Sequence, residues 1–345
     1  MCRSVAIIGR MRDDVAARDL TPATPRLAPS AAGAQISVCL LTYNHVDVVG
    51  STLDSVLEQT LPEFELIVSD DCSTDGTWEL ISRRAASDPR IVAVRTPQNL
   101  GMPGNANFAA RHARRPYLAL LHHDDLYRPD LLARWHAVAA RHPDVGFVFN
   151  AYRDAGGRHM GHPFSAERLD GGWFLERQLL PRWGCPVRGT ALIRRSAWDA
   201  LGGMREEFGL LADVDLWMRL AALGPVGYVP EPLITVRQER PAYYPADYQS
   251  STWSWRRQRY LYAIHAHNWG ERYPLARARH RLARLEFRTR LSLETAKWLV
   301  YALLRRRWPM LVDAGESVTA HDQPWLRALR RALCQLATWR ERGPA

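Results

Sequence analysis

Two imidazoles and two carboxylates follow one another in this sequence, as His122, His123, Asp124 and Asp125. Adjacent carboxylates repel each other unless something positive lies between them, and a divalent cation is the simplest such partner. Carboxylate oxygens suit Mg²⁺ or Mn²⁺, and neutral imidazole is also a metal ligand. The pattern therefore predicts a divalent cation site. The alternative is an acidic turn in which an Asp only caps the next helix.

The segment that must position this cluster is residues 117–121, a short apolar run directly before it. An uncharged run of this length predicts a buried strand of a parallel sheet. Pro129 suits the first turn of a helix that we expect to extend to Arg141. The cluster would then lie at the carboxyl end of a strand, where open α/β sheets bind their ligands.

The same alternation of strand and helix recurs before and after this segment. We expect strands at residues 36–41, 64–69, 91–95, 117–121 and 146–150, with helices between them. Such alternation predicts right-handed crossovers and a largely parallel sheet. The strands are followed by Thr42 and Asn44, by Asp71 and by Asp124, so polar side chains collect at one edge of the sheet. Helix capping alone would not produce a set of this kind.

Composition limits the class of protein. The chain has 345 residues, of which 47% are hydrophobic and 24% are charged, as in ordinary globular proteins. The five cysteines are scattered, so we expect no zinc site or disulfide framework, and a reduced, cytoplasmic setting fits best. We expect no signal peptide, and no apolar stretch approaches the roughly 20 residues that span a bilayer. The Gly-x-Gly-x-x-Gly motif of nicotinamide-binding domains does not follow the first strand.

Three parts are expected along the chain. Residues 1–34 lack periodicity and predict a disordered leader, and residues 35–250 hold the α/β domain. Residues 251–345 contain 19 basic and 7 acidic residues, a net charge of +12, in amphipathic patterns that predict a basic helical tail. This tail suits a helix lying on an anionic membrane surface, and the alternative is a helical cap packed on the α/β domain. Nucleic-acid binding is not expected, because no known module accompanies the charge.

The motifs of residues 36–236 resemble those of glycosyltransferase family 2, the inverting nucleotide-sugar glycosyltransferases with the GT-A fold. The matching stretches are residues 37–44, 68–77, 99–107, 122–130 and 212–220. The resemblance implies a Rossmann-like, mostly parallel sheet flanked by helices, with the basic helical region after it. It also implies transfer of a sugar from a nucleotide-diphosphate donor, expected to be UDP-linked, to a hydroxyl with inversion. The expected setting is surface polysaccharide or glycolipid assembly on a glycan or lipid-linked acceptor, at the inner face of the membrane if the tail binds lipid.

The resemblance also implies which residues bind the donor. The nucleobase and ribose would be held by the turn of Thr42, Tyr43 and Asn44 and by Asp71. Further residues expected to bind the nucleotide sugar are Asn107, His123 and Asp124.

The expected cofactor is Mg²⁺ or Mn²⁺, with Asp124 as its principal ligand. His122 stands where the family has the first Asp of its Asp-x-Asp signature, and its imidazole either ligates the ion or hydrogen-bonds a ribose or phosphate oxygen. Asp125 either orients the site or caps the following helix. The ion would neutralise the charge that builds on the leaving diphosphate.

On the acceptor side the resemblance implies that Asp213 is the base that takes the proton of the acceptor hydroxyl. Ala212 replaces the Glu of the usual Glu-Asp pair. Asp215 is expected to cap the helix or to pair with Arg219.

Two further residues, Trp217 and Arg188, are expected on the acceptor side. Trp217 either stacks on a sugar ring or belongs to the core, and Arg188 belongs to a segment that would touch the acceptor.

Three departures from the family pattern, Ala106, His122 and Ala212, raise a second hypothesis, a catalytically impaired protein that binds nucleotide sugars as a scaffold. A third hypothesis is a basic membrane-binding adaptor dominated by its tail.

Overall fold

The computed structural model describes residues 35–61, 63–162, 164–180 and 185–237, together with single helical positions between residues 261 and 332. The predicted leader at residues 1–34 and the predicted domain boundary near residue 250 lie outside the described residues.

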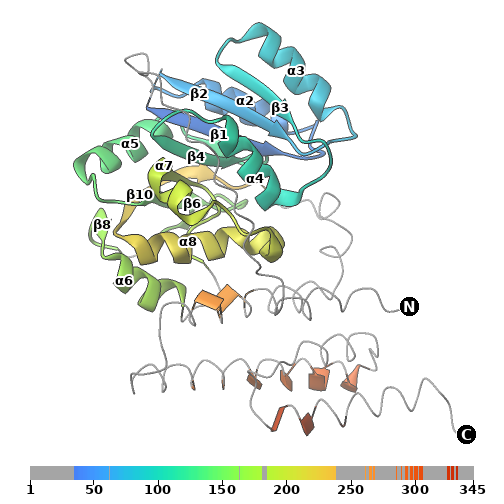
Figure 1. The fold of residues 1–345 in the computed structure, drawn as a ribbon, viewed down its shortest axis with the longest axis vertical. Helices are drawn as coiled ribbons and strands as arrows, with labels where there is room; N and C mark the ends of the chain where they lie inside the picture. Colours follow the sequence, from blue (N-terminus) through green and yellow to red (C-terminus); the bar gives the residue numbers. More distant parts are fainter. Residues whose placement is uncertain are drawn as a thin grey trace, which may run out of the picture. The chain divides into compact units, whose positions relative to one another are not determined.

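Strand and helix alternate through the first part of the chain, as the sequence predicts (Figure 1). The elements are β1 (Ile36–Thr42), α2 (Val49–Leu57), β2 (Phe64–Asp70), α3 (Thr77–Ser87), β3 (Ile91–Arg95), α4 (Gly101–His112), β4 (Tyr117–His122), β5 (Leu126–Tyr127), α5 (Leu131–Arg141) and β6 (Phe147–Arg153). All five predicted strands are present. Pro129 precedes α5 instead of lying in its first turn.

The second part of the chain has shorter elements and ends in one long helix and one long strand. They are β7 (His159–Met160), β8 (Arg168–Leu169), α6 (Gly171–Phe174), the π-helical turn η1 (Leu175–Leu179), β9 (Ala191–Arg194), α7 (Arg195–Leu201), the 3₁₀ segment η2 (Glu206–Leu211), α8 (Ala212–Leu223) and β10 (Val226–Thr235).

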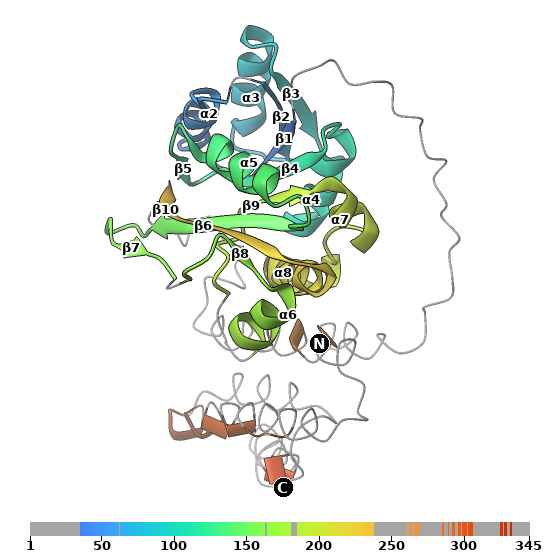
Figure 2. The same cartoon turned by 90° about the vertical axis from the view of Figure 1, so that its left-hand side faces the viewer.

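One sheet carries all the described strands, in the order β3-β2-β1-β4-β9-β6-β10-β5, with β7 paired to β6 and β8 to β10 (Figure 2). The pairs from β3 to β4 are parallel. Strand β9 runs antiparallel between β4 and β6, so the sheet is mixed beyond β4. Because Ala191, the first residue of β9, pairs with Leu120, the residues just before β9 reach the carboxyl edge of β4.

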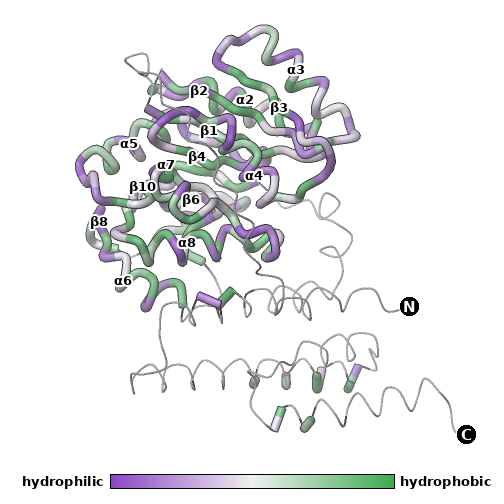
Figure 3. Tube along the Cα trace, viewed as in Figure 1, coloured by the Kyte–Doolittle hydropathy of each residue, from purple (hydrophilic) through white to green (hydrophobic). Residues whose placement is uncertain are grey.

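Both faces of the sheet are covered by helices. Along β1, Val38 and Leu40 join a core cluster with α2, α3 and α5, whereas Cys39 and Leu41 join a second cluster with α4, α6, α7 and α8. A strand buried on both faces reads as a continuous apolar run, which explains why it was recognisable in the sequence. Figure 3 shows the hydrophobic residues concentrated in these central strands.

Part of the C-terminal region packs on the same core, since Leu261 and Ile264 belong to the second cluster. Across the described positions, no helix combines the length and the apolar composition needed to cross a bilayer.

Replacement of Gly171 by Ala should destabilise the fold by about 2–3 kcal/mol, because the new methyl group would overlap the backbone carbonyl oxygens of Gly224 and Ala221. Urea unfolding would measure this loss. Gly146→Ala is the matched control, since its methyl group would lie 3.8 Å from the carbonyl oxygen of Leu220, an ordinary contact. Equal unfolding midpoints for the two variants would contradict the close packing of α6 on α8.

Candidate active site

The register of the parallel strands brings the predicted polar residues to one edge of the sheet. Thr42 at the end of β1 pairs with Asp70 on β2, and its neighbour Leu41 pairs with His122 on β4. Asp70 in turn pairs with Arg95 at the end of β3. The convergence expected from the sequence is therefore present in the structure.

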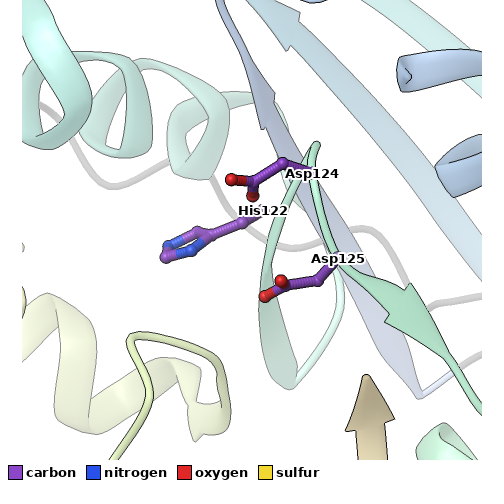
Figure 4. A group of neighbouring side chains, drawn as sticks. All are labelled: His122, Asp124 and Asp125. Carbon is purple, nitrogen blue, oxygen red and sulfur yellow. The ribbon is translucent and has the colours of Figure 1, made fainter. Parts of the chain in front are cut away.

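His122, Asp124 and Asp125 form a cluster that is able to hold a metal ion. Their ligand atoms lie within 4.8 Å of one another, and Figure 4 shows the three side chains directed to the same side of the turn after β4. One imidazole and two carboxylates are a donor set that suits Mn²⁺ or Mg²⁺. The residues present therefore fit the predicted cofactor.

The backbone of this cluster is fixed by buried neighbours. The hydroxyl of Tyr127 donates to the carbonyl oxygen of His122 at 2.7 Å and accepts from its N–H at 2.8 Å. The hydroxyl of Thr52 on α2 lies 2.7 Å from the carbonyl oxygen of His123. Helix α5 begins only after Asp130, so neither Asp124 nor Asp125 caps it. Of the two alternatives from the sequence, the acidic turn that only caps a helix is ruled out.

Charge is unevenly distributed over the cluster. Burial lowers the pKa of His122, and it lowers that of His123 to about 4, so both imidazoles are neutral at pH 7. Burial raises the pKa of Asp124, but the imidazoles of His123, His122 and His45 outweigh this effect and the carboxyl stays ionised. Burial and the charge of Asp124 raise the pKa of Asp125 to about 7. The two carboxylates thus repel each other enough that a cation between them would be strongly favoured.

His123 lies on the donor side with one ring nitrogen unused. Its Nδ1 donates to the carbonyl oxygen of Leu41 at 2.7 Å, and its ring lies against that of His45, with centroids 3.9 Å apart. Because Nδ1 carries the proton, Nε2 has the lone pair, and this buried nitrogen has no hydrogen-bond partner among the described residues. The predicted contact of His123 with the nucleotide sugar stays a prediction.

The turn after β1 is held against the loop after β2. Asn44, at φ 51°, donates its N–H to Ser73 Oγ at 2.9 Å, and its Oδ1 accepts from the N–H of Thr74 at 2.8 Å. Tyr43 beside it is half-buried, and within the described part of the chain the buried hydroxyl of Thr42 has no hydrogen-bond partner. Thr42 thus retains an unused polar atom at the predicted donor site, whereas the side-chain oxygen of Asn44 is already used to shape the turn.

The two Asp residues after β2 have different roles. Asp71 is buried, and its Oδ1 accepts from Thr96 Oγ1 at 2.9 Å and from the N–H of Leu100 at 2.8 Å. Burial raises its pKa despite these hydrogen bonds. Asp70 accepts from the N–H of Ser73 at 3.0 Å and pairs with Arg95 at 3.2 Å. Asp71 lies at the predicted edge, and Asp70 organises the loop around it.

Asn107, predicted to bind the nucleotide sugar, forms hydrogen bonds within the chain. It belongs to α4, and its carboxamide donates to the carbonyl oxygen of Met204 and accepts from the N–H of Met204, both at 2.9 Å. These bonds occupy both ends of the carboxamide. The structure thus shows Asn107 bonded to the loop before α8, and its contact with the nucleotide sugar stays a prediction.

Asp213 lies in the first turn of α8 and faces the metal-capable cluster across Gly189. A Cβ built on Gly189 would lie 2.7 Å from Cε1 of His122 and 3.1 Å from Oδ2 of Asp213. Burial raises the pKa of Asp213 to about 6, with partial compensation by the N–H of Val214 and the charge of Arg188. A carboxylate with a pKa near 6 is suited to general-base catalysis.

Arg188 lies close both to the metal-capable cluster and to Asp213. Its positive charge lowers the pKa values of His122, Asp125 and Asp213, and its guanidinium lies 5.8 Å from the centre of the Tyr152 ring. The residue predicted for the acceptor side is therefore close to the donor-side cluster as well.

Trp217 and Asp215 are both fully buried, and the side chain of Trp217 lies close enough to Asp213 to offset part of the rise that burial causes in the pKa of that carboxyl. Trp217 is fully buried and packs on Phe147 with ring centroids 5.2 Å apart, which agrees with the core alternative and rules out stacking on an acceptor sugar. Asp215 is also fully buried, and its Oδ2 accepts from Nε of Arg219 at 2.7 Å. The predicted pairing of Asp215 with Arg219 is confirmed.

Sequence reasoning missed three residues that shape the site: Asp70, Tyr127 and Gly189. The double Asp after β2 was a signal for Asp70. Gly189 shows φ +81°, a conformation that favours glycine, but nothing in the sequence distinguishes it from the many other glycines. Nothing in the sequence pointed to Tyr127. Its hydroxyl reaches the backbone of His122 only because the turn after β4 folds back on that strand.

Comparison with known proteins shows which family the chain resembles. Residues 37–202 match the model of the family described as glycosyl transferase family 2. Among curated relatives, the putative glycosyltransferase EpsE of Bacillus subtilis is 28% identical over 221 residues, which are 61% of this chain and 76% of EpsE. The putative teichuronic acid biosynthesis glycosyltransferase TuaG of the same species is 37% identical over 99 residues, 29% of this chain and 39% of TuaG. The chain thus spans most of EpsE but well under half of TuaG.

Solved structures share the fold. S. aureus TarS 1–349 in complex with UDP-GlcNAc superposes with a TM-score of 0.61 at 18% identity, covering 88% of this chain and 87% of that chain. The mannosyltransferase PcManGT from Pyrobaculum calidifontis, in complex with GDP-Man and Mn²⁺, gives a TM-score of 0.54 at 21% identity, covering 91% and 84%. At these identities the likeness establishes a GT-A fold.

Replacement of Asp124 by Ala should weaken Mn²⁺ binding by more than about tenfold, because it removes the ionised carboxylate of the cluster. His122→Asp should keep or strengthen binding, since it restores a second hard oxygen ligand. Titration calorimetry with Mn²⁺ would measure both. Asp130→Ala, which removes a carboxylate paired with Arg128 and Arg134 outside the cluster, is the control. Parent-like affinity of Asp124→Ala would show that the ion does not bind here.

Proposed function

The chain belongs to glycosyltransferase family 2, and we propose that it transfers a sugar from a UDP-linked donor to an acceptor hydroxyl with inversion of the anomeric centre. The observation that supports this most is the position of Asp213 opposite His122 across Gly189. A donor bound at the cluster after β4 would have its anomeric carbon between the two. The base would then approach from the side opposite the leaving diphosphate, as a single displacement requires.

On the donor side, the residues that would accept hydrogen bonds from the nucleoside are different from those that would bind a divalent cation. Asp71, Thr42 and the lone pair of His123 would orient the nucleoside, and His122, Asp124 and Asp125 would hold a divalent cation. That cation would neutralise the charge of the leaving diphosphate. Arg188, which lies close enough to lower the pKa of both Asp125 and Asp213, would add positive charge between the diphosphate and the base.

On the acceptor side, Asp213 would take the proton from the attacking hydroxyl. Its raised pKa makes the carboxylate a stronger base than an exposed Asp, while leaving it mostly ionised at pH 7. The acceptor oxygen forms its bond to the anomeric carbon as the bond from that carbon to the diphosphate oxygen breaks. One displacement of this kind inverts the anomeric centre.

The relatives suggest the setting. TarS 1–349 has been solved with UDP-GlcNAc, and the E. coli relative WfaP is described as a UDP-Glc:α-D-GlcNAc-diphosphoundecaprenol β-1,3-glucosyltransferase. WfaP is 35% identical over 92 residues, 27% of this chain and 36% of WfaP. By analogy, we propose a UDP-linked donor, a glycan or lipid-linked acceptor, and a role in surface polysaccharide or glycolipid assembly at the cytoplasmic face of the membrane.

An exposed apolar face in the C-terminal region supports contact with that membrane. Leu293, Val300, Tyr301 and Leu304 are exposed at 58%, 48%, 39% and 76%, and their helical spacing places them on one side. Lys297 is exposed on the same side, whereas Ser292 and Leu299 are buried on the opposite one. An apolar face with a cation, in a region of net charge +12, suits an anionic lipid surface.

Replacement of Asp213 by Asn should lower turnover by roughly 10²- to 10⁴-fold while leaving donor and Mn²⁺ affinity nearly unchanged, because Asn cannot accept the proton. The donor would first be chosen by thermal stabilisation in a panel of nucleotide sugars with Mn²⁺ or Mg²⁺. Because Asp213 must be ionised, turnover of the parent should rise with pH and reach half its plateau near pH 6. Release of nucleoside diphosphate would measure both.

Glu207→Gln is the matched control for Asp213→Asn, since Glu207 is an exposed carboxylate on the preceding segment. Asp215→Asn is not a suitable control, because it breaks a buried ion pair and would act through stability. Similar turnover in Asp213→Asn and Glu207→Gln would show that another group is the base.

Replacement of Leu293 and Leu304 together by Glu should weaken flotation with phosphatidylserine vesicles, because both leucines lie on the exposed apolar face. Binding of the parent should fall as salt is raised, since the electrostatic part is screened. Leu285→Glu is the control, because Leu285 is exposed but, by its helical spacing, lies off this face. If the intact protein does not float at any salt concentration, the face binds something other than membrane.

A further inference from the structure

Behind the proposed base lies a buried polar cluster that joins the C-terminal region to α8. Its centre is Asp215, two residues after Asp213 and fully buried. Oδ2 of Asp215 accepts from Arg219 at 2.7 Å, and Oδ1 accepts from Nδ2 of Asn268 at 2.8 Å. The remaining neighbour of Oδ1 is Arg205, at 3.5 Å. Among the described residues, Asn268 therefore provides the short hydrogen bond to that oxygen.

The same cluster holds the loop that leads into α8. The guanidinium of Arg219 donates to the carbonyl oxygens of Leu201 at 3.1 Å and Gly203 at 2.9 Å. Asn107 on α4 holds the adjacent Met204 through both ends of its carboxamide. The loop before Asp213 is thus held by hydrogen bonds from two sides. The Asp215–Arg219 pair provides the bonds on one side, and Asn107 provides those on the other.

The region around Asn268 is itself well seated on the α/β domain. Leu261 and Ile264 are buried in the same core cluster as Ala212, Val214 and Leu216 of α8. His265 is buried, and its Nε2 lies 3.2 Å from the carbonyl oxygen of Leu179. Asn268 also donates to the carbonyl oxygen of Ile264 at 2.9 Å, so the orientation of its carboxamide is fixed.

From these contacts we infer that Asn268 is a positioning residue for catalysis: through Asp215 it holds the first turn of α8 so that Asp213 faces the cleft. The segment from Leu261 to Asn268 is then an integral part of the acceptor half of the site. This inference rests on the proposed function for its effect on turnover. The mechanical coupling from Asn268 to α8 does not depend on any substrate.

Two replacements remove the contact in different ways. Asn268→Leu leaves Oδ1 of Asp215 with the distant Arg205 alone, and Asn268→Asp places a second carboxylate beside it. Asn150→Leu is the control for general destabilisation, because it removes another buried Asn, which accepts from Trp135 Nε1 at 3.0 Å far from α8 in sequence.

Amide hydrogen exchange on the full chain tests the coupling without substrate. Asn268→Leu and Asn268→Asp should each accelerate exchange in residues 203–218 by about tenfold or more, while exchange in β1 stays unchanged. Asn150→Leu should not affect this region selectively. Unchanged exchange at residues 203–218 in both single variants would overturn the inference.

Kinetics then test the consequence for catalysis. At a temperature where all variants are folded, kcat should fall about tenfold or more in the Asn268 variants, while affinity for UDP with Mn²⁺ stays within about twofold. Faster exchange with parent-like kcat, or an equal loss of kcat in Asn150→Leu, would overturn the positioning role. If the parent transfers no sugar from any donor, the proposed function fails, and the exchange data alone decide whether Asn268 holds α8.

Discussion

The proposed active site depends on the absence of a side chain at residue 189. The two halves of the site approach each other at Gly189 so closely that a Cβ would lie 2.7 Å from His122 and 3.1 Å from Asp213. The antiparallel direction of β9 produces this approach, because it makes the segment before Ala191 enter the sheet beside the carboxyl end of β4. A side chain here would separate the base from the metal-capable cluster.

Electrostatics in the cleft follow from this close approach. Asp124, Asp125 and Asp213 would give a strongly negative site that repels a diphosphate. Burial and mutual repulsion raise the pKa of Asp125 to about 7 and burial raises that of Asp213 to about 6, which reduces the negative charge. Arg188 acts in the opposite sense on both carboxyls and keeps them partly ionised. The positive charge of Arg188 therefore has two consequences. It keeps Asp213 ionised enough to act as a base, and it offsets negative charge that would repel the diphosphate of the donor.

The strands and the edge residues could be predicted because their signals are local. Each buried strand is an apolar run, and each run is followed directly by polar residues such as Asp71 and Asp124. The hydrogen bonds of Asn107 could not be predicted, because its partner Met204 lies 97 positions away and only the folded chain brings them together. The contact of Asn268 with Asp215 spans 53 positions, and it could not be predicted from the sequence either. Local pattern therefore identifies the candidate reactive groups, whereas the groups that hold them in place depend on tertiary packing.

The three departures from the family pattern fall on two kinds of position. Ala106 and Ala212 are fully buried in the core cluster that includes α4 and α8. A charged side chain at either position would need a buried partner, and Ala removes that need at no cost to packing. His122, in contrast, stays at the edge of the sheet with its ligand atom within 4.8 Å of those of Asp124 and Asp125. The polar groups that remain are those next to the proposed reacting centre, which favours an active transferase over an impaired scaffold.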